Sequence, residues 1–430
     1  MNFKTNTPTQ ATTRSPWTWV PSLYFAEGLP YVMIMTVSVI FYKRMGVDNS
    51  DIAFYTGWLY LPWVIKPFWS PVVEMLKTKR WWITVMQLIL GAGMGCVALT
   101  IPLPSYFQLT LLFFWLTAFS SATHDIAADG FYILGLNDNQ QSLFVGIRST
   151  FYRIAMITGQ GALVMLAGRL ETLTGNIPLA WSVTFGGVAI IMILCGLYHL
   201  WALPKPAIDR PIAIDGSFWN GFGNTFVSFF LKKDIGLTLA FLLLFRLAES
   251  QLVKMASPFL LDATNKGGLG IDTETVGFIY GTIGLIALSA GGILGGLAAS
   301  KHGLKHWLWW MTIAINVPNM VYVIMAWLQP SNLWLISAGV AIEQFGYGFG
   351  FTAFMLYMIY YSEGESQTAH FAICTGFMAL GMMLPGMASG WIQEWMGYKL
   401  FFIWVMLCTI PGFILVRIID IHKDYGKTKK

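Results

Sequence analysis

Long stretches without charged residues alternate with short polar interruptions along most of the chain. The 44 positions between Arg80 and Asp125 contain no Asp, Glu, Lys or Arg, and only residues 102–105, Pro-Leu-Pro-Ser, interrupt them near the middle. A helix needs roughly 20 apolar residues to cross the hydrocarbon core of a bilayer, and proline-rich polar breaks mark turns. This run therefore predicts two membrane-spanning helices joined by a tight turn.

The same pattern, followed through the whole chain, predicts an all-α polytopic membrane protein with about twelve spans. The expected helices are 17–42, 51–74, 81–100, 106–135, 143–168, 179–203, 235–262, 273–300, 307–328, 333–361, 368–394 and 400–421.

Composition agrees with a membrane protein. Hydrophobic residues make up 56% of the 430 positions and charged residues only 11%, whereas soluble domains carry about 25% charge. The net charge of +5 does not indicate nucleic-acid binding. The cysteines stand apart from one another in apolar stretches without C-x-x-C spacing, so we expect packing residues and no metal site; they are Cys96, Cys195, Cys374 and Cys408.

The longest polar interruption lies at the midpoint and divides the spans six plus six. We expect a cytoplasmic tail at 1–16, a first bundle at 17–203, a linker at 204–234, a second bundle at 235–421 and a basic cytoplasmic tail at 422–430. The leader has no cleavable signal character. With both termini in the cytoplasm, 16 of the 26 Lys and Arg residues lie on that side and 5 on the other, as the positive-inside rule favours.

The two halves repeat a pattern between their second and third helices. Residues 66–74, followed by a basic turn, correspond to the glycine-rich residues 291–296, followed by another basic turn. Two six-helix halves with this echo fit the major facilitator architecture, in which a central site between the halves opens alternately to each side.

Several local strings resemble signature segments of the AmpG-type permeases, in the same order along nearly the whole transmembrane chain. They are Tyr24-Phe-Ala-Glu-Gly-Leu-Pro30, Lys66-Pro-Phe-Trp-Ser-Pro71, His124-Asp-Ile-Ala-Ala-Asp-Gly130, Pro258-Phe-Leu-Leu-Asp262, Glu343-Gln-Phe-Gly-Tyr-Gly-Phe-Gly350 and Ser389-Gly-Trp-Ile392. That family belongs to the major facilitator superfamily beside the acetyl-coenzyme A transporters. The resemblance implies a permease that imports N-acetylglucosaminyl-anhydromuramyl peptides for peptidoglycan recycling, driven by the proton gradient.

Charged groups inside a span are costly, so they normally face a cavity or a partner. Asp125 and Asp129 are four residues apart and share one helix face, where two close carboxylates can exchange a proton. The alternative is that they hold Arg148 or Arg153 in salt bridges or lock a gate. Those arginines lie five positions apart, roughly 140° around a helix, so we expect only one to face the cavity, and Arg153 is the substrate-binding candidate.

The seventh helix carries a denser set of charges than the resemblance implies. Arg246 and Glu249 are spaced for a pair within the helix, or else Arg246 or Lys254 receives an anionic substrate group through charge-assisted hydrogen bonds. Glu27 and Glu343 lie beside glycines in the first and tenth helices and are further candidates for proton coupling or gating; the alternative for Glu27 is a hydrogen-bonded packing residue. Lys66 is expected to reach the interface by snorkelling.

Proteins bind sugars through aromatic ring faces and through amide or hydroxyl groups that donate hydrogen bonds. The remaining substrate-binding candidates within the spans are Tyr31, Gln160, Asn316, Gln344 and Tyr347. Each of them has an alternative role as a contact between helices.

The function that these features predict is a proton-coupled importer of peptidoglycan-derived amino sugars, most readily anhydromuropeptides, in the bacterial inner membrane. Another sugar, free N-acetylmuramic acid or an acyl-coenzyme A is the alternative cargo. We expect a monomer in the bilayer without cofactor, metal or catalytic residues. A membrane enzyme or a sensor of a lipid-linked sugar is the remote alternative, because an enzyme needs converging His, Asp or Cys residues and the short loops lack them.

Overall fold

The computed structural model describes residues 14–136, 138–207, 209–211, 216–364, 367–423 and 425–426. All the regular elements in these ranges are helical, which confirms the predicted all-α class. Residues 1–13 of the predicted N-terminal tail, and residues 424 and 427–430 of the predicted C-terminal tail, lie outside the described part of the chain.

The helical segments follow one another in the order of the predicted spans. The first half contains η1 (Pro16–Thr18), α1 (Val20–Val32), η2 (Met33–Val37), α2 (Ser38–Arg44), α3 (Asn49–Trp58), α4 (Leu61–Leu76), α5 (Lys79–Thr100), α6 (Tyr106–Gly135), α7 (Asp138–Met156), η3 (Ile157–Leu163), α8 (Val164–Thr174) and α9 (Ile177–Ala202). The segment predicted to link the halves contains α10 (Gly216–Phe230).

The second half repeats this succession. It contains α11 (Ile235–Leu244), α12 (Leu247–Leu261), η4 (Thr264–Lys266), α13 (Thr273–Phe278), η5 (Ile279–Gly284), α14 (Leu285–His302), α15 (Leu304–Asn316), η6 (Val317–Asn319), α16 (Met320–Leu328), α17 (Leu333–Ser362), α18 (Gln367–Leu407) and α19 (Ile410–Ile418). Within α18 the chain changes direction at Gly397, whose φ of 72° lies in the left-handed region that glycine adopts without strain.

Eight helical stretches of the described chain are long and apolar enough to span a membrane, and the last of them, Ala369–Ile418, includes both the eleventh and the twelfth predicted spans. The predicted spans missing from this set are the second, fourth and tenth. Two of those correspond to α6 and α17, which are 30 residues each and carry the ionisable groups considered below. The architecture is thus the predicted helical membrane bundle.

Three predicted spans are interrupted by a two-residue turn in the structure, namely the second, the seventh and the twelfth, which is divided at Cys408 and Thr409 between α18 and α19. The second is divided into α3 and α4, and Pro62 occupies the first turn of α4, where its missing N–H breaks no helical hydrogen bond. The seventh is divided at Phe245 and Arg246 into α11 and α12. Arg246 therefore precedes a new helix, and Glu249 lies in the first turn of that helix, where a negative charge is favoured by the helix dipole.

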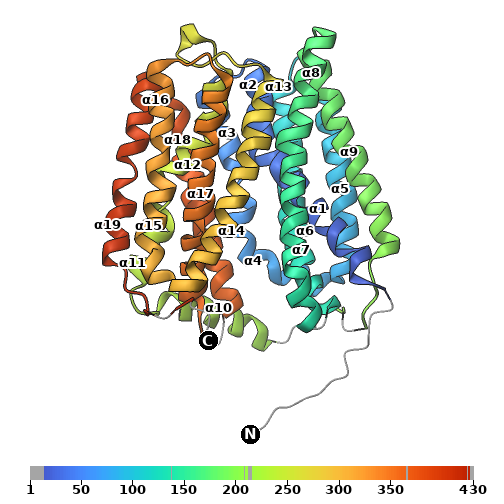
Figure 1. Ribbon diagram of the computed structural model, residues 1–430. Helices are drawn as coiled ribbons and strands as arrows, with labels where there is room; N and C mark the ends of the chain where they lie inside the picture. Colours follow the sequence, from blue (N-terminus) through green and yellow to red (C-terminus); the bar gives the residue numbers. More distant parts are fainter. Residues whose placement is uncertain are drawn as a thin grey trace.

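The two ends of the bundle differ in what they carry. Figure 1 shows α10 at the lower end, whereas α2, α8 and α13 reach the upper end. We call the end with α10, the start of α1 and the end of α19 the terminal end, and the opposite one the far end.

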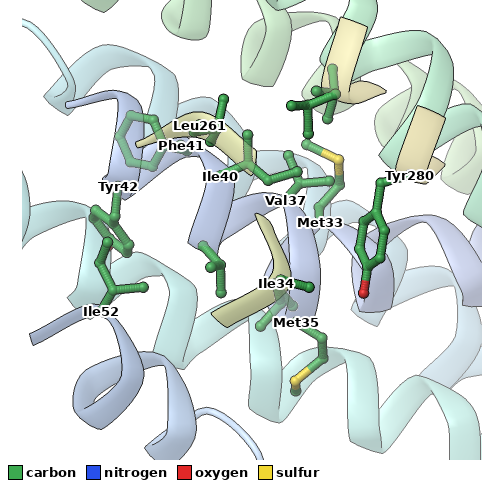
Figure 2. Packing of buried hydrophobic residues seen from close by; sticks show 14 of the residues in the cluster. Met33, Ile34, Met35, Val37, Ile40, Phe41, Tyr42, Ile52, Leu261 and Tyr280 are labelled. Atoms are coloured by element: carbon green, nitrogen blue, oxygen red, sulfur yellow. The ribbon is translucent and has the colours of Figure 1, made fainter. Parts of the chain in front are cut away.

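Apolar side chains of both halves share one buried cluster around η2. Figure 2 shows Met33, Ile34 and Val37 of η2 in the same cluster as Leu261 and Tyr280 from the second half. The π-helical turn of η2 accommodates one extra residue, a feature frequent at functional sites in helices. The first span therefore contacts the second half through an irregular, tightly packed surface.

Candidate functional site

Three carboxyl groups meet between α1 and α6. Glu27 comes from α1, and Asp125 and Asp129 come from successive turns of α6. Carboxylate oxygens of the three residues all lie within 4.8 Å of one another. The predicted placement of Asp125 and Asp129 on one helix face is therefore confirmed, and Glu27 lies beside them.

Two cations from neighbouring helices each pair with one of these carboxylates. Lys66 of α4 forms an ion pair with Asp125, and Arg148 of α7 donates to Asp129 over 2.7 Å. The guanidinium of Arg148 also lies 4.4 Å from the ring centroid of Tyr24. Charge-assisted hydrogen bonds of this kind are stronger than neutral ones, so they hold α1, α4, α6 and α7 together.

These pairs decide between the sequence-based alternatives. The expectation that Lys66 snorkels to the interface is wrong, because its ammonium group is turned to Asp125 inside the bundle. A salt bridge to Arg148 is formed, but only by Asp129. Hydropathy could not have distinguished these cases, since a lysine between prolines is compatible with either orientation.

Glu27 is the carboxyl group of this cluster that forms no ion pair with a residue that the structure describes. It is 7% exposed, and its Oε2 atom has no hydrogen-bond partner in the described part of the chain. With every group ionised, three negative charges would face two positive ones. Burial of an unpaired charge is costly, so one proton or one monovalent cation held at Glu27 would balance the cluster.

A second polar cluster lies where the seventh span is interrupted. Arg246 donates from Nε and an Nη atom to the two carboxylate oxygens of Glu249, over 3.1 and 3.2 Å, and from an Nη atom to the Tyr347 hydroxyl over 2.7 Å. Its guanidinium also lies 4.8 Å from the ring centroid of Phe351. The pair within the helix is therefore formed, and it connects α12 with α17.

Two further cations near the boundary between the halves have no ion pair among the described residues. Lys254, 2% exposed, donates to the hydroxyl of Thr56 in the other half over 2.8 Å and lies 5.3 Å from the ring centroid of Tyr60. The guanidinium of Arg153 lies against Gly292 of α14 in the other half. These two groups can receive a substrate anion without first breaking an ion pair.

A group of aromatic rings lies between the two charged clusters. Tyr31 lies 5.3 Å from Trp63 and 6.4 Å from Tyr152, measured between ring centroids. Tyr31 also lies within electrostatic range of Asp125 in its own half and of Arg246 in the other. Trp63 was missing from the predicted site, because in a chain with 16% aromatic residues no local signal singles out one ring.

The other predicted candidates are dispersed. The Gln344 amide donates to Glu343 over 3.0 Å, and Glu343 is 3% exposed without a cation partner in the described chain. The backbone of Gln160 lies against Gly281 of the other half. The Asn316 amide donates to the Thr312 carbonyl of its own helix over 2.9 Å, so no described contact joins it to either charged cluster.

The far end is closed by a polar network between the halves. Asp262, which follows α12, forms an ion pair with Lys43 of α2 over 2.7 Å and accepts from the Tyr398 hydroxyl over 2.7 Å. Asn49 donates to Gln393 over 2.6 Å and to Tyr398 over 2.9 Å. We call these five residues the far-end lock.

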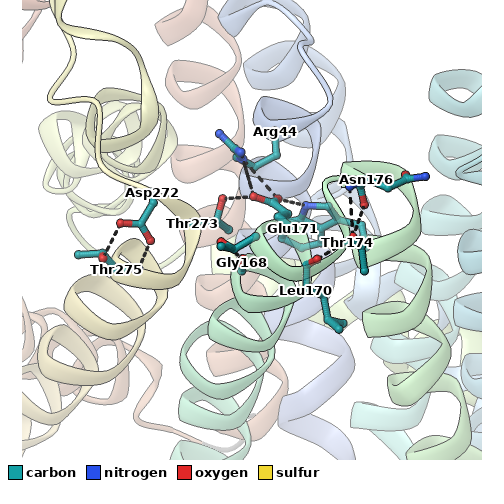
Figure 3. A network of polar contacts seen from close by, with 11 residues as sticks. Arg44, Gly168, Leu170, Glu171, Thr174, Asn176, Asp272, Thr273 and Thr275 are labelled. Atoms are coloured by element: carbon teal, nitrogen blue, oxygen red, sulfur yellow. Dashed lines mark hydrogen bonds and ion pairs between the residues drawn. The ribbon is translucent and has the colours of Figure 1, made fainter.

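A second contact closes the same end between α8 and α13. Figure 3 shows Glu171 as its centre, with an ion pair to Arg44 of 2.9 Å and a hydrogen bond from Thr273 of 2.9 Å. Arg44 and Glu171 come from the first half and Thr273 from the second. Below this contact the backbones of η3 and η5 meet at Gly161 and Gly281, where small residues allow helices to approach closely.

Solvent exposure differs between the two levels of the molecule. The side chains of Lys43 and Asp262 at the far end are 12% and 9% exposed. In the carboxylate cluster, Arg148 and Asp129 are 30% and 41% exposed. Asp129 lies six residues before the end of α6 at Gly135, so this more exposed pair lies toward the terminal end. The structure is closed at the far end.

Several proteins similar to this chain are named as transporters or permeases. Residues 26–200 match the model of the BT1 family. A putative transporter, AmpG 4, of Rickettsia conorii is 26% identical over 414 residues, covering 93% of this chain and 95% of the relative. The anhydromuropeptide permease of Escherichia coli is 23% identical over 412 residues, covering 94% of this chain and 80% of the permease. The resemblance to AmpG-type permeases is therefore confirmed over most of the chain.

Solved structures establish the fold. A crystal structure of the nucleoside transporter NupG superposes with a TM-score of 0.68 at 15% identity, covering 93% of this chain and 96% of NupG. A D-xylose-proton symporter superposes with a TM-score of 0.68 at 10% identity, covering 96% and 98%. The chain has the predicted major facilitator fold. Together with this fold, the transporters among the sequence relatives support a secondary transporter embedded in a membrane.

Proposed function

We propose that this chain, a multi-pass transporter with the major facilitator fold and a resemblance to AmpG-type permeases, is a proton-coupled importer of anhydromuropeptides. The observation that carries the coupling is the unequal charge of the carboxylate cluster, in which Glu27, Asp125 and Asp129 have only Lys66 and Arg148 as ion-pair partners among the described residues. The proton gradient is then the driving force, and no cofactor takes part.

Glu27 is the proton carrier in this proposal. Asp125 and Asp129 already have cations as partners, whereas Glu27 has none in the described chain. A proton on Glu27 removes the excess negative charge without moving either ion pair. A ligand shifts a conformational equilibrium only by its different affinity for the two states, so Glu27 must bind its proton unequally in the outward and inward states.

The proposed substrate class is supported by the name of one similar protein and by the chemistry of the side chains near the boundary between the halves. One relative is named an anhydromuropeptide permease, and a muropeptide carries carboxylates and sugar rings. Lys254 and Arg153 offer unpaired cations near the boundary between the halves. Tyr31, Trp63 and Tyr152 offer aromatic faces nearby. A charged amino sugar matches this combination better than a neutral one.

We place both termini in the bacterial cytoplasm, since most Lys and Arg residues then lie on the cytoplasmic side. The far end is then periplasmic, and its closure by the far-end lock corresponds to an inward-facing state. Import ends in such a state, after the substrate has passed the closed side.

Uptake into proteoliposomes tests the function. Vesicles with an imposed pH gradient receive an anhydromuropeptide, free N-acetylmuramic acid, a neutral disaccharide or acetyl-coenzyme A. We expect accumulation of the anhydromuropeptide above its equilibrium level, abolished by a protonophore. Preferential accumulation of another compound would reject the proposed substrate, and accumulation that follows a sodium gradient instead would reject the proton.

Glu27→Gln tests the coupling residue, because the amide retains the shape but cannot bind the proton. Gradient-driven accumulation should fall to the equilibrium level, whereas exchange of substrate between the two sides should persist. Glu343→Gln is the matched comparison, since Glu343 is equally buried but lies outside the carboxylate cluster. If Glu343→Gln uncouples uptake and Glu27→Gln does not, the coupling role belongs to the second half.

A further inference from the structure

A basic hollow lies on the terminal end of the first half. Its volume is about 430 Å³, and it is lined by the side chains of Arg14, Arg80 and Lys205 together with Leu200 and Trp201. It is formed where the chain enters the first span, where α5 begins and where α9 ends. None of the residues that line the hollow belongs to the carboxylate cluster.

The three cations of this hollow have no ion pair among the described residues. Arg80 donates to the backbone carbonyls of Leu203, over 3.2 Å, and Leu200. Arg14 lies 4.7 Å from the ring centroid of Trp201, and one of its guanidinium nitrogens is buried without a hydrogen-bond partner.

A carboxylate beside this set, that of Asp209, forms hydrogen bonds with the backbone at the start of α5. Asp209 accepts hydrogen bonds from the backbone N–H groups of Lys79 and Arg80, over 2.8 and 3.1 Å. Even with Asp209 counted, Arg14, Arg80 and Lys205 leave an excess of positive charge at the hollow.

An equivalent hollow occurs in the second half. Its volume is about 290 Å³, and Lys305, Trp309 and Arg417 line it. It lies between the start of α15 and the end of α19, which are the ninth and twelfth spans, as the first hollow lies between the third and the sixth. The fold therefore repeats the hollow at corresponding places in its two halves.

The two hollows share a stacked arginine but differ in charge. Arg417 lies 4.9 Å from the ring centroid of Trp309, as Arg14 lies over Trp201. In the second hollow, however, Lys305 forms an ion pair of 2.7 Å with Asp420. One of its two cations is thus neutralised, whereas the first hollow keeps all three.

The surroundings point to a ligand with both a phosphate and apolar chains. Leu200 and Trp201 are 47% and 63% exposed in the last turn of α9, a helix long and apolar enough to span the membrane. Tryptophan at a helix end marks the level of lipid headgroups, and basic pockets between spans hold anionic headgroups. A free anion would use the cations but not this apolar rim.

We propose that the first hollow binds the phosphodiester headgroup of an anionic phospholipid, and that the second hollow binds the same class of lipid more weakly. The guanidinium groups hold the phosphate oxygens, and the acyl chains lie along the apolar surface of the adjacent span. Both sites follow from the internal repeat of the fold, independently of the transported substrate.

Lipid titration of the purified full-length protein in detergent, followed by native mass spectrometry, measures this binding. The ligands are phosphatidylglycerol, phosphatidylethanolamine and inorganic phosphate. Arg14→Gln with Lys205→Gln removes two cations without touching Arg80, which holds backbone carbonyls. Each Lys or Arg near a headgroup contributes about fivefold in affinity, so the double variant should bind phosphatidylglycerol about thirtyfold more weakly.

A charge-matched control distinguishes lipid binding in the hollow from nonspecific attraction of anionic lipid to positive charge at this end of the bundle. Lys77→Gln with Lys301→Gln removes two exposed cations from the same end of the bundle, but neither lines a hollow. This control should bind phosphatidylglycerol as the unchanged protein does. Arg14→Lys with Lys205→Arg should also retain binding, which shows that the double variant loses charge and not structure.

Asp420→Asn tests the second hollow, because it releases Lys305. In the background of Arg14→Gln with Lys205→Gln, it should recover part of the lost phosphatidylglycerol binding. The proposal is overturned if the charge-matched control loses as much binding as the double variant, if phosphatidylethanolamine binds as tightly, or if inorganic phosphate competes at the concentration of the lipid. Failure of Asp420→Asn to recover binding would remove the second site.

Discussion

At the scale of single residues, the partners of a charged group determine what the group can do. Asp125 and Asp129 each have a cation, whereas Glu27 beside them has none in the described chain. The three residues were all recognisable in the sequence as costly charges within spans. Which of them is left unpaired depends on Lys66 and Arg148, whose orientation a linear pattern does not contain.

Replacement of Lys66 should lower the free energy of unfolding, because Asp125 loses its cation partner. Lys66→Met leaves Asp125 beside two other carboxylates, and loss of one partner of a buried pair costs about 3–5 kcal/mol. The side chains of Lys66 and Asp125 are 25% and 21% exposed, so we expect the smaller loss of about 1–3 kcal/mol because solvent screens the charges. Thermal unfolding in detergent measures it as a lower apparent melting temperature.

A double-mutant cycle shows whether the loss of stability in Lys66→Met comes from the ion pair or from packing. Lys66→Met combined with Asp125→Asn removes both charges and should recover most of the lost stability. If the double variant is as unstable as Lys66→Met or less stable, Lys66 contributes through packing of its aliphatic chain and not through its ion pair.

At the scale of elements, irregular helices allow the halves to meet. The π-helical turns η3 and η5 lie against each other at the boundary, with the backbone of Gly281 touching that of Gln160. The sequence places glycines inside many of the spans. It did not show which glycines face the other half. All faces of these helices carry apolar residues, so the sequence does not indicate how each helix is rotated about its axis.

Gly281→Ala tests this contact. The added methyl group would overlap the Gln160 carbonyl, so the far end could close only after the two helices move apart. Overpacking of this kind costs about 1–3 kcal/mol, and we expect substrate uptake to fall about tenfold or more. Gly296→Ala in the same span is the control, because a Cβ there meets no atom within 4 Å; equal uptake by the two variants would contradict the prediction.

At the scale of the whole molecule, polar contacts between the two halves close the far end. The far-end lock and the contact around Glu171 both join the first half to the second at the far end. Polar contacts that form in only one of two states shift the balance between those states. The lock therefore stabilises this conformation relative to one that is open at the far end.

Asp262→Asn should weaken the lock, because it removes the charge that pairs with Lys43. A hydrogen bond to a charged group contributes about 1.5–3 kcal/mol, which corresponds to a population shift of at least tenfold toward far-end opening. Spin labels at Asp48→Cys and Trp395→Cys, in a protein without its four native cysteines, report the separation of the halves.

The expected result is a longer or broader distance distribution for Asp262→Asn than for the labelled parent. Asp420→Asn also breaks an ion pair, but at the terminal end and within the second half, so it should leave this distribution unchanged. The lock has no role if the Asp262→Asn distribution coincides with that of the parent.

The sequence by itself determined the all-α membrane class, the order of the helical segments and the identity of the ionisable groups inside them. These features follow from the free energy of transferring side chains from water into lipid, which depends on the local composition of the sequence. Only the tertiary structure decided that Lys66 pairs with Asp125, that Glu27 is unpaired and that Asp262 joins the halves. Such contacts depend on how each helix is rotated and which helix lies beside it, and uniformly apolar spans carry no periodic pattern that specifies either.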